Sequence, residues 1–473
     1  MGAMRGVVAD EPPTTTEAAG RALPGAARWW LGAGLVLAAL NLRPAITTLG
    51  PLMAEVRQGL GMSGTVAGVL TSVPSLCFAL LGPAAPRLAR RFGPAAVVCG
   101  GLATVAAGLA LRPFAGGTAG FLLLSALALA GIAVGNVLMP VVVKRWFPDR
   151  VGPATGVYSM ALTAGSAVSA AGAVPLADAL GGGWRPGLAV WSLLALAAAG
   201  AWWGLARRNG RAAPAAGPVR EAPAPHVRVS RSPTAWALAV FFGLQATGAY
   251  ITMGWLPQIF RDAGVGAGTA GLLAAVTMLV GVPFSLLLPG IAARVRNQGF
   301  VALALVACGL AGYAGLRFAP AAGCWAWAVL LGIANSSFPL ALTMIGMRAR
   351  TGAGVVRLSA FAQSVGYLLS VPGPLLVGRL YQATGGWDLP VALLAALLVP
   401  QAVAAVLAGR DRSVEDEGRP RCGNGRTDWD TGGMPVMDTN PDPKKGQKAF
   451  LTILGAMLGI TVVIGVIATF ASG

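Results

Sequence analysis

Twelve apolar segments, each about 20 residues long, follow one another along the chain, and this is the length that a helix needs to cross the hydrocarbon core of a bilayer. A backbone that spans the bilayer must also form its own hydrogen bonds, which favours helices. We therefore expect an all-α membrane protein. The predicted spans are 29–51, 64–83, 94–112, 118–142, 153–177, 187–206, 235–258, 268–289, 299–318, 322–346, 355–378 and 388–409.

The polar composition excludes several classes of protein. Only 11% of the residues are charged, against about 25% in a soluble domain. The five cysteines lack metal-ligand or CxxC spacing, and the single histidine, His226, lies in a polar segment. We therefore expect no metal, no cofactor and no structural disulfide. Residues 1–28 are polar and are expected to be a disordered cytoplasmic N-terminus, after which the first apolar segment stays as an anchor.

The positive charges are distributed unevenly along the chain. The N-terminal segment and the connections after even-numbered spans hold 20 of the 35 Lys and Arg residues, whereas the six odd-numbered connections hold one each. The positive-inside rule then places the N-terminus in the cytoplasm. We expect a multi-pass, monomeric protein of a bacterial inner membrane that contacts lipid. A nucleic-acid footprint would instead gather on one soluble face.

The chain divides into two similar halves, 29–206 and 235–409, joined by an Arg/Pro/Ala-rich segment, 207–234, which we interpret as a flexible cytoplasmic linker. The second span of each half begins alike, with Ala67-Gly68-Val69-Leu70 and Ala270-Gly271-Leu272-Leu273. The fourth spans share Asn-x-x-x-Pro. Two six-span halves with the same orientation are typical of transporters whose solute site lies at the midplane between them.

The segment after the second span, Gly82-Pro83-Ala84-Ala85-Pro86-Arg87-Leu88-Ala89-Arg90-Arg91, resembles the signature gating loop of the major facilitator superfamily, Gly-x-x-x-Asp-Arg/Lys-x-Gly-Arg-Arg/Lys. Pro86 replaces the family's acid, which helps to latch the two halves together, and Ala89 replaces the second glycine. The resemblance implies a twelve-helix fold of two six-helix halves. The matching positions are Gly82, Arg87, Arg90 and Arg91.

Further motifs within 29–409 resemble the cyanate/nitroimidazole branch of that superfamily. The resemblance implies a secondary active or facilitative transporter that moves a small polar or anionic solute by alternating access. The motifs are Asn41-Leu42-Arg43-Pro44-Ala45, Gly243-Leu244-Gln245, Trp255-Leu256-Pro257 and Arg261-Asp262-Ala263-Gly264.

Arg43 is the most informative single residue, because it lies about half-way along the first span. A guanidinium at that depth costs at least a few kcal/mol, so such residues are generally functional. We expect Arg43 to face a central cavity and to bind an anion or a strongly polar solute. The alternative is that backbone carbonyls freed by Pro44 satisfy it. Pro44 should break the helix at this depth.

The other candidates are polar side chains near the middle of their spans. They are expected to hold the solute together with Arg43, although interhelical hydrogen bonding is an alternative role for the three amides on the later spans. Tyr158 and Ser166 are expected to serve packing. No Asp or Glu lies at mid-span, so a buried carboxylate relay for protons is not expected. The candidates are Asn41, Thr47, Gln245, Tyr250, Asn335, Gln363 and Tyr367.

Three other functions are alternatives to this one. A multidrug or metabolite efflux carrier is the alternative within transport, but efflux of cations would favour an intramembrane acid. A non-transporting receptor or scaffold would move no solute. An enzyme would need a nucleophile with its base, or metal ligands, within the spans, and neither is found.

Residues 410–473 lie outside the main resemblance. We expect 410–448 to be a flexible cytoplasmic tail and 449–470 to be an extra transmembrane helix. This part resembles small single-span proteins associated with transporters, and Met434 could be a former start site. The alternative is a simple C-terminal anchor.

Overall fold

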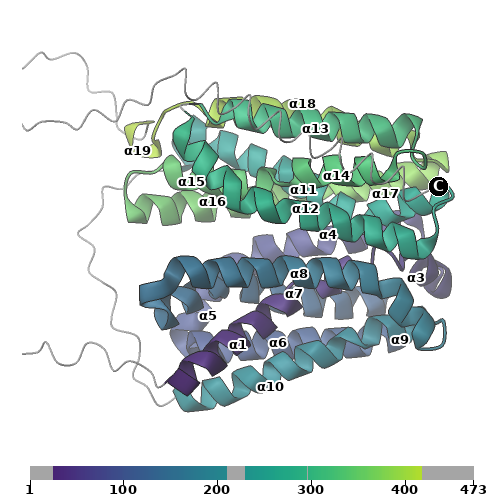
Figure 1. Cartoon of the computed structure of the whole chain (residues 1–473), viewed down its shortest axis with the longest axis horizontal. Coiled ribbons are helices and arrows are strands. Elements are labelled where there is room, and N and C mark those ends of the chain that lie inside the picture. The colour runs from purple at the N-terminus through teal and green to yellow at the C-terminus, as the bar shows by residue number, and fades with distance from the viewer. Residues whose placement is uncertain (1–24, 210–228, 296, 418–473) are drawn as a thin grey trace, which may run out of the picture.

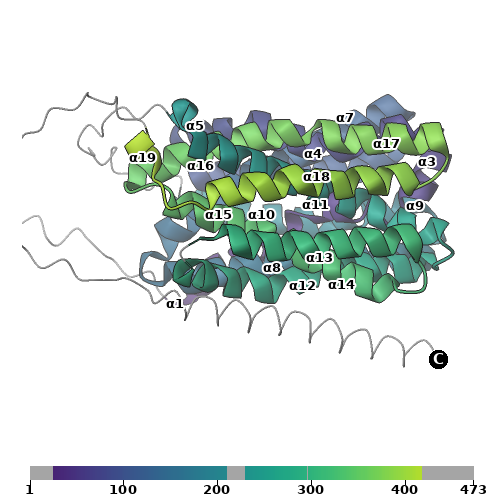
Figure 2. The same ribbon diagram turned by 90° about the horizontal axis from the view of Figure 1, so that it is seen from above.

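The computed structural model describes residues 25–209, 229–295 and 297–417, and these are helical with no β-strand. Figure 1 shows two layers of long helices, with the N-terminal half (purple to blue) below the C-terminal half (teal to yellow). Figure 2 shows that α5 and α19 lie at one end of the bundle and that α3 lies at the other. We call these the α5 end and the α3 end.

The N-terminal half contains the first six spans of the chain. Its helices are α1 (Gly25–Asn41), α2 (Pro44–Thr47), α3 (Met53–Leu60), α4 (Gly64–Leu81), η1 (Gly82–Ala84), α5 (Ala85–Phe92), α6 (Pro94–Leu111), η2 (Arg112–Phe114), α7 (Thr118–Trp146), η3 (Pro148–Arg150), α8 (Val151–Ala179), α9 (Trp184–Ala189) and α10 (Trp191–Asn209).

The C-terminal half repeats this order of spans and adds a short last helix. Its helices are η4 (Val229–Arg231), α11 (Pro233–Asp262), α12 (Ala267–Arg294), α13 (Gly299–Phe318), α14 (Cys324–Asn335), α15 (Ser337–Met347), α16 (Gly352–Ser370), α17 (Pro372–Thr384), α18 (Asp388–Ala408) and α19 (Val414–Glu417).

The twelve predicted spans are confirmed within the described residues, where twelve helical segments are long and apolar enough to cross a membrane. Many large apolar side chains on their outer surfaces are exposed, as expected of helices that face lipid. The predicted extra helix at 449–470, residues 1–24, most of the linker and the tail beyond Glu417 lie outside the described residues.

The first span is broken where Pro44 was expected to break it. Regular helix ends at Asn41, Arg43 lies outside it, and α2 begins at Pro44. Proline has no amide hydrogen, so the helical bond that would run back to the carbonyl of Leu40 is missing. The break leaves Arg43 on irregular backbone near the middle of the span.

Two other spans are interrupted in a way that the sequence analysis did not predict. The tenth span divides into α14 and α15 at Ser336, and Pro339 leaves the carbonyl of Asn335 without its helical donor. Gln245 Nε2 of α11 donates to that carbonyl instead, at 3.3 Å. The eleventh span divides before Pro372, and Ser72 Oγ of α4 donates to Val371 O at 2.8 Å.

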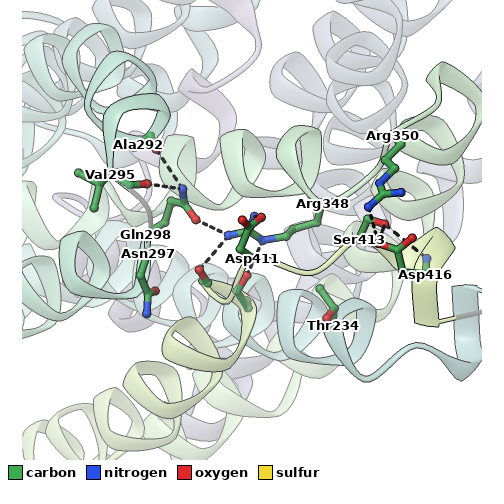
Figure 3. A network of polar contacts seen from close by, with 12 residues as sticks. Thr234, Ala292, Val295, Asn297, Gln298, Arg348, Arg350, Asp411, Ser413 and Asp416 are labelled. Atoms are coloured by element: carbon green, nitrogen blue, oxygen red, sulfur yellow. Dashed lines mark hydrogen bonds and ion pairs between the residues drawn. The ribbon is translucent and has the colours of Figure 1, made fainter. Parts of the chain in front are cut away.

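A buried arginine ties the helices together at the α5 end of the C-terminal half (Figure 3). Arg348, at the end of α15, donates through Nε to Ala408 O and through Nη2 to Gly409 O, both at 2.9 Å. Nη2 also contacts Gln298 Oε1, in the connection between α12 and α13. Burial lowers the pKa of Arg348, and Asp411 acts in the opposite direction.

The described structure continues past Gly409 into the first eight residues of the predicted flexible tail, 410–448. Glu417 of α19 accepts hydrogen bonds at the start of α11, including one from Thr234 Oγ1 at 2.7 Å. Glu415 accepts one from the Arg350 amide at 3.0 Å, just before α16. Both carboxylates therefore lie at helix N-termini, where negative charge is favourable. Residues 410–417 thus pack against the C-terminal half.

Candidate functional site

Arg43 lies at the break in the first span, between α1 and α2, and is half-buried. Its carbonyl accepts hydrogen bonds from the amides of Ile46 and Thr47, at 2.9 and 3.1 Å. None of the ion pairs in the described part of the chain involves its guanidinium. The structure therefore places a cation at mid-span without a carboxylate partner there.

Three tyrosines lie within the range over which the charge of Arg43 acts on their phenol groups. They are Tyr158 of α8, Tyr250 of α11 and Tyr367 of α16. Arg43 and Tyr158 belong to the N-terminal half, whereas Tyr250 and Tyr367 belong to the C-terminal half. The two halves therefore both contribute to the surroundings of Arg43.

Tyr367 is also the centre of a group of aromatic rings. The ring of Phe78 from α4 stacks on it, with centroids 5.0 Å apart and an interplanar angle of 22°. Phe242 meets it edge-on at 5.0 Å, and Tyr250 lies 6.5 Å away. Phe338 of α15 follows at 5.7 Å from Phe242. These rings form a largely buried aromatic cluster, and two of its members, Tyr250 and Tyr367, lie within reach of the Arg43 charge.

The three candidate amides of the C-terminal half differ in their environments. Gln245 is buried, and while its Nε2 donates to Asn335 O, its Oε1 has no partner within the described structure. Asn335 lies at the break of the tenth span and is half-buried. Gln363 is half-buried and donates to Ser359 Oγ at 2.7 Å. Gln245 thus serves interhelical bonding through its amide nitrogen and keeps a free acceptor.

Asn41 and Thr47 instead contact neighbours within the N-terminal half. Asn41 Nδ2 donates to Leu37 O and, at 3.2 Å, to Leu194 O of α10. Thr47 Oγ1 and Ser169 Oγ of α8 share a hydrogen bond of 2.5 Å. Both side chains hold the broken first span against its own half.

Several aromatic residues of the site were not among the predicted site residues. Phe78, Phe242 and Phe338 are apolar residues in apolar helices, and the chain offers no local signal that separates a binding surface from ordinary packing. Tyr158 was expected to serve packing, yet it lies near Arg43. Only the arrangement of helices from both halves distinguishes these residues.

A small cavity lies next to the site, between α2, α4, α7 and α11. It has room for about one water molecule. Its lining is apolar apart from Thr71 and Tyr250, and its other residues are Ile46, Leu49, Leu70, Pro74, Leu129 and Gly254. Residues of both halves therefore line this cavity.

Polar contacts join the two halves at the α3 end. Arg261 of α11 pairs with both carboxylate oxygens of Glu55 of α3, at 2.9 and 2.7 Å, and also donates to Pro51 O at 2.9 Å. Gln382 of α17 accepts hydrogen bonds from the amide and hydroxyl of Thr65, at the start of α4. These contacts close the α3 end in this conformation.

An aromatic group supports this closure. Tyr381 stacks on Trp387 with centroids 4.4 Å apart, and the guanidinium of Arg57, from the other half, lies 5.3 Å from the Tyr381 ring centre. Asp262 accepts hydrogen bonds from Tyr381 and Trp387, at 3.0 and 2.8 Å. A cation over an aromatic face is attractive even when it is exposed.

The predicted gating loop forms η1 and the exposed helix α5, at the opposite end of the molecule. Gly82 begins η1, and Arg87, Arg90 and Arg91 lie exposed on α5. None of these arginines takes part in an ion pair within the described residues. This matches the absence of the family's acid, which Pro86 replaces.

Family models match two parts of the chain. The model of the Major Facilitator Superfamily matches residues 31–371. A second model, described as transporter-associated, matches residues 435–473. The predicted resemblance of the C-terminal part to transporter-associated proteins is therefore confirmed.

Three curated relatives align with most of the chain. The uncharacterized transporter YycB of Bacillus subtilis (strain 168) is 35% identical over 82% of this chain and 95% of the relative. The 2-nitroimidazole transporter of Escherichia coli (strain K12) is 35% identical over 83% and 98%. The cyanate transport protein CynX of the same strain is 32% identical over 75% and 90%. All three are transporters, so the chain is grouped with transporters and not with enzymes.

A solved structure shares the fold. The bacterial homolog of the human lysosomal transporter Spinster, in an inward-facing and unoccupied conformation, matches with a TM-score of 0.64 and 16% identity, over 84% of this chain and 100% of that chain. The family model matches 341 residues, which is more than half of the chain. The two six-span halves and the likeness to this structure agree with that match. The chain belongs to the major facilitator superfamily.

Proposed function

We propose that the protein moves a small polar or anionic solute, of the cyanate or nitroimidazole type, across the membrane by alternating access, with Arg43 as its main polar anchor. One observation carries the proposal. The Arg43 guanidinium is half-buried at a helix break, has no ion-pair partner in the described chain, and lies near tyrosines of both halves. The names of the curated relatives support the class of solute.

The chemistry of the site favours a flat solute. A guanidinium offers its donors in a planar fork that suits an anion with two acceptor atoms. The ring of Tyr367 lies within the reach of the Arg43 charge and is surrounded by other rings. A flat anion can therefore pair edge-on with the cation while its face packs on an aromatic ring.

The contacts between the halves support alternating access. The Arg261–Glu55 pair and the Thr65–Gln382 bonds close the α3 end, so the solute enters this conformation from the α5 end. The opposite state requires these contacts to separate while the α5 ends approach one another. Because the site is built from both halves, a bound solute favours the states in which both halves touch it.

We further propose that the α5 end faces the cytoplasm, that the N-terminus is cytoplasmic and that the protein works as a monomer. The excess of Lys and Arg in the connections at that end supports this orientation. In a protein whose only cysteine is Ala215→Cys, a membrane-impermeant thiol reagent should fail to label this cysteine in intact cells and should label it after lysis. Strong labelling in intact cells would reverse the orientation.

Uptake into proteoliposomes tests the function. The probes are radiolabelled cyanate and 2-nitroimidazole, and the variants are Arg43→Lys and Arg43→Gln. Arg379→Lys, at an exposed arginine of α17, is the matched control. We expect saturable uptake by the wild type and by the control. The Arg43→Lys protein should have a markedly raised KM, because it keeps the charge but loses the planar fork.

The alternatives give different results. Normal KM in both Arg43 variants would place the solute elsewhere. Loss of uptake together with loss of the folded protein, measured by melting temperature on the same samples, would make Arg43 structural. No flux of any probe would favour a receptor or scaffold, and flux of bulky apolar cations would favour a multidrug carrier.

A further inference from the structure

Arg112 is fully buried, with 0% of its surface exposed, although it lies in η2 near the α3 end of the third span. Its Nη1 donates to Ala45 O at 3.0 Å, and its guanidinium carbon lies 5.8 Å from the ring centre of Phe121. Its Nε and Nη2 are buried without a partner in the described structure. In the sequence, Arg112 is one of the six arginines that lie singly at the odd-numbered connections.

The hydrogen bond from Arg112 satisfies a carbonyl of the broken first span, Ala45 O, that receives no helical hydrogen bond. Ala45 belongs to α2, a helix of four residues. The amide of Leu49, which would reach Ala45 O in a continuing helix, donates to Ile46 O instead, at 3.2 Å. A buried carbonyl without a donor is costly. Arg112 supplies the donor that the backbone does not.

The corresponding arginine of the C-terminal half is more exposed and has an ion-pair partner. Arg317 ends the ninth span, is 40% exposed in its side chain and pairs with Asp388 at 2.7 Å. In the N-terminal half, the sixth span begins near Arg185, which donates to Pro113 O at 3.0 Å, so this position offers no acid. Arg112 is thus buried without a counter-ion, an arrangement that is unfavourable unless the arginine does something specific.

We propose that Arg112 is a positioning residue for the solute site: it holds α2 in place and thereby sets the position of Arg43. This inference rests on the proposed function, in which Arg43 anchors the solute. Ala45 is two residues from Arg43, and the opposite side of α2 is held by the bond between Thr47 and Ser169. The short helix is therefore fastened to two neighbours, and only the Arg112 bond reaches its backbone from the third span.

The test uses Arg112→Met, which is apolar, and Arg112→Gln, which is polar but two bonds shorter than arginine. Arg317→Met is the matched control at the corresponding place. Two assays use the purified full-length protein: hydrogen–deuterium exchange of the segment 44–52, and uptake into proteoliposomes, which gives the KM and maximal rate for cyanate and 2-nitroimidazole. The melting temperature is recorded on the same samples.

We expect faster exchange over 44–52 in both Arg112 variants. Their KM should rise about threefold to tenfold, the range that matches the loss of one hydrogen bond, while the maximal rate changes little. The melting temperature should fall by a few degrees, because Ala45 O loses its donor. The control should match the wild type in both measurements. If Arg112→Met does not fold, Arg112→Gln alone carries the test.

Unchanged exchange would show that Arg112 does not hold α2, and faster exchange with an unchanged KM would show that it does not position the site. Either result overturns the inference. Arg43→Gln is measured in parallel, so that failure of the proposed function is recognised separately. A normal KM in the Arg43→Gln protein would refute the proposed solute site at Arg43. A raised KM in Arg43→Gln together with a normal KM in the Arg112 variants would refute only the role of Arg112.

Discussion

The contact between Arg261 and Glu55 gives the sharpest prediction about the transport cycle. This pair joins α11 to α3 and thus exists only while the α3 ends of the two halves meet. Replacing Glu55→Gln removes the charge but keeps an amide oxygen of similar shape. The variant should open the α3 end more often without disturbing either half.

The size of the effect follows from the geometry. The pair has two hydrogen bonds, of 2.9 and 2.7 Å, but its side chains are 21% and 36% exposed, so solvent screens it. Exposed ion pairs contribute about 0.2–1 kcal/mol, and this two-bond geometry belongs near the upper limit. A loss of about 1 kcal/mol, counted only in the closed state, raises the ratio of open to closed α3 ends about fivefold.

Labelling of a cysteine from outside measures this ratio. Thr71→Cys, beside the small cavity, is introduced in a protein whose native cysteines have been replaced. A membrane-impermeant maleimide added to intact cells should react about five times faster with the Glu55→Gln protein, following the population shift. Asp388→Asn is the control, because it breaks the Arg317 pair at the same end but within one half. Equal labelling rates in the Glu55→Gln protein and its parent would refute the reasoning.

Three further predictions concern packing and stability. Gly378→Ala places a Cβ against the Gly64 carbonyl oxygen of the other half, so the same labelling rate should rise several-fold with an unchanged melting temperature. Arg348→Met leaves buried partners unpaired, at a cost of about 1–3 kcal/mol, and should lower the melting temperature by several degrees, whereas Arg350→Met, at an exposed pair, should not. Truncation after Glu417 should keep uptake and melting temperature near those of the full chain, and a large loss of either would show that the tail belongs to the transport unit.

The twelve spans, the two halves and the family could be predicted because they depend on local properties. A run of about 20 apolar residues is sufficient evidence for a span, and the repeat of Ala67-Gly68 as Ala270-Gly271 is visible in the letters alone. Pro44 likewise predicts a break in the first span, because a proline cannot donate to the carbonyl four residues before it. Arg43 stands out for the same reason, because a cation within an apolar segment is unusual whichever residues contact it in the fold.

The site residues could be predicted only in part. The amides and hydroxyls at mid-span were found because they are polar, but their neighbours were not. Asn41 bonds α10 and Thr47 bonds α8, whereas Tyr158 lies near Arg43. Phe78 and Tyr367 stack although 289 positions separate them. The direction in which a helix turns each side chain depends on packing with helices distant in the chain.

The breaks in the helices separate what the sequence alone determines from what the tertiary structure decides. Local chemistry determined that prolines within spans free backbone carbonyls, because proline lacks an amide hydrogen. Only the tertiary structure decided which side chain reaches the backbone at each break: Arg112 reaches Ala45, Gln245 reaches Asn335 and Ser72 reaches Val371. Each of these donors comes from another span, tens to hundreds of residues away. The physical reason is that a hydrogen bond needs two groups within about 3 Å, and only the folded arrangement of the two halves brings them there.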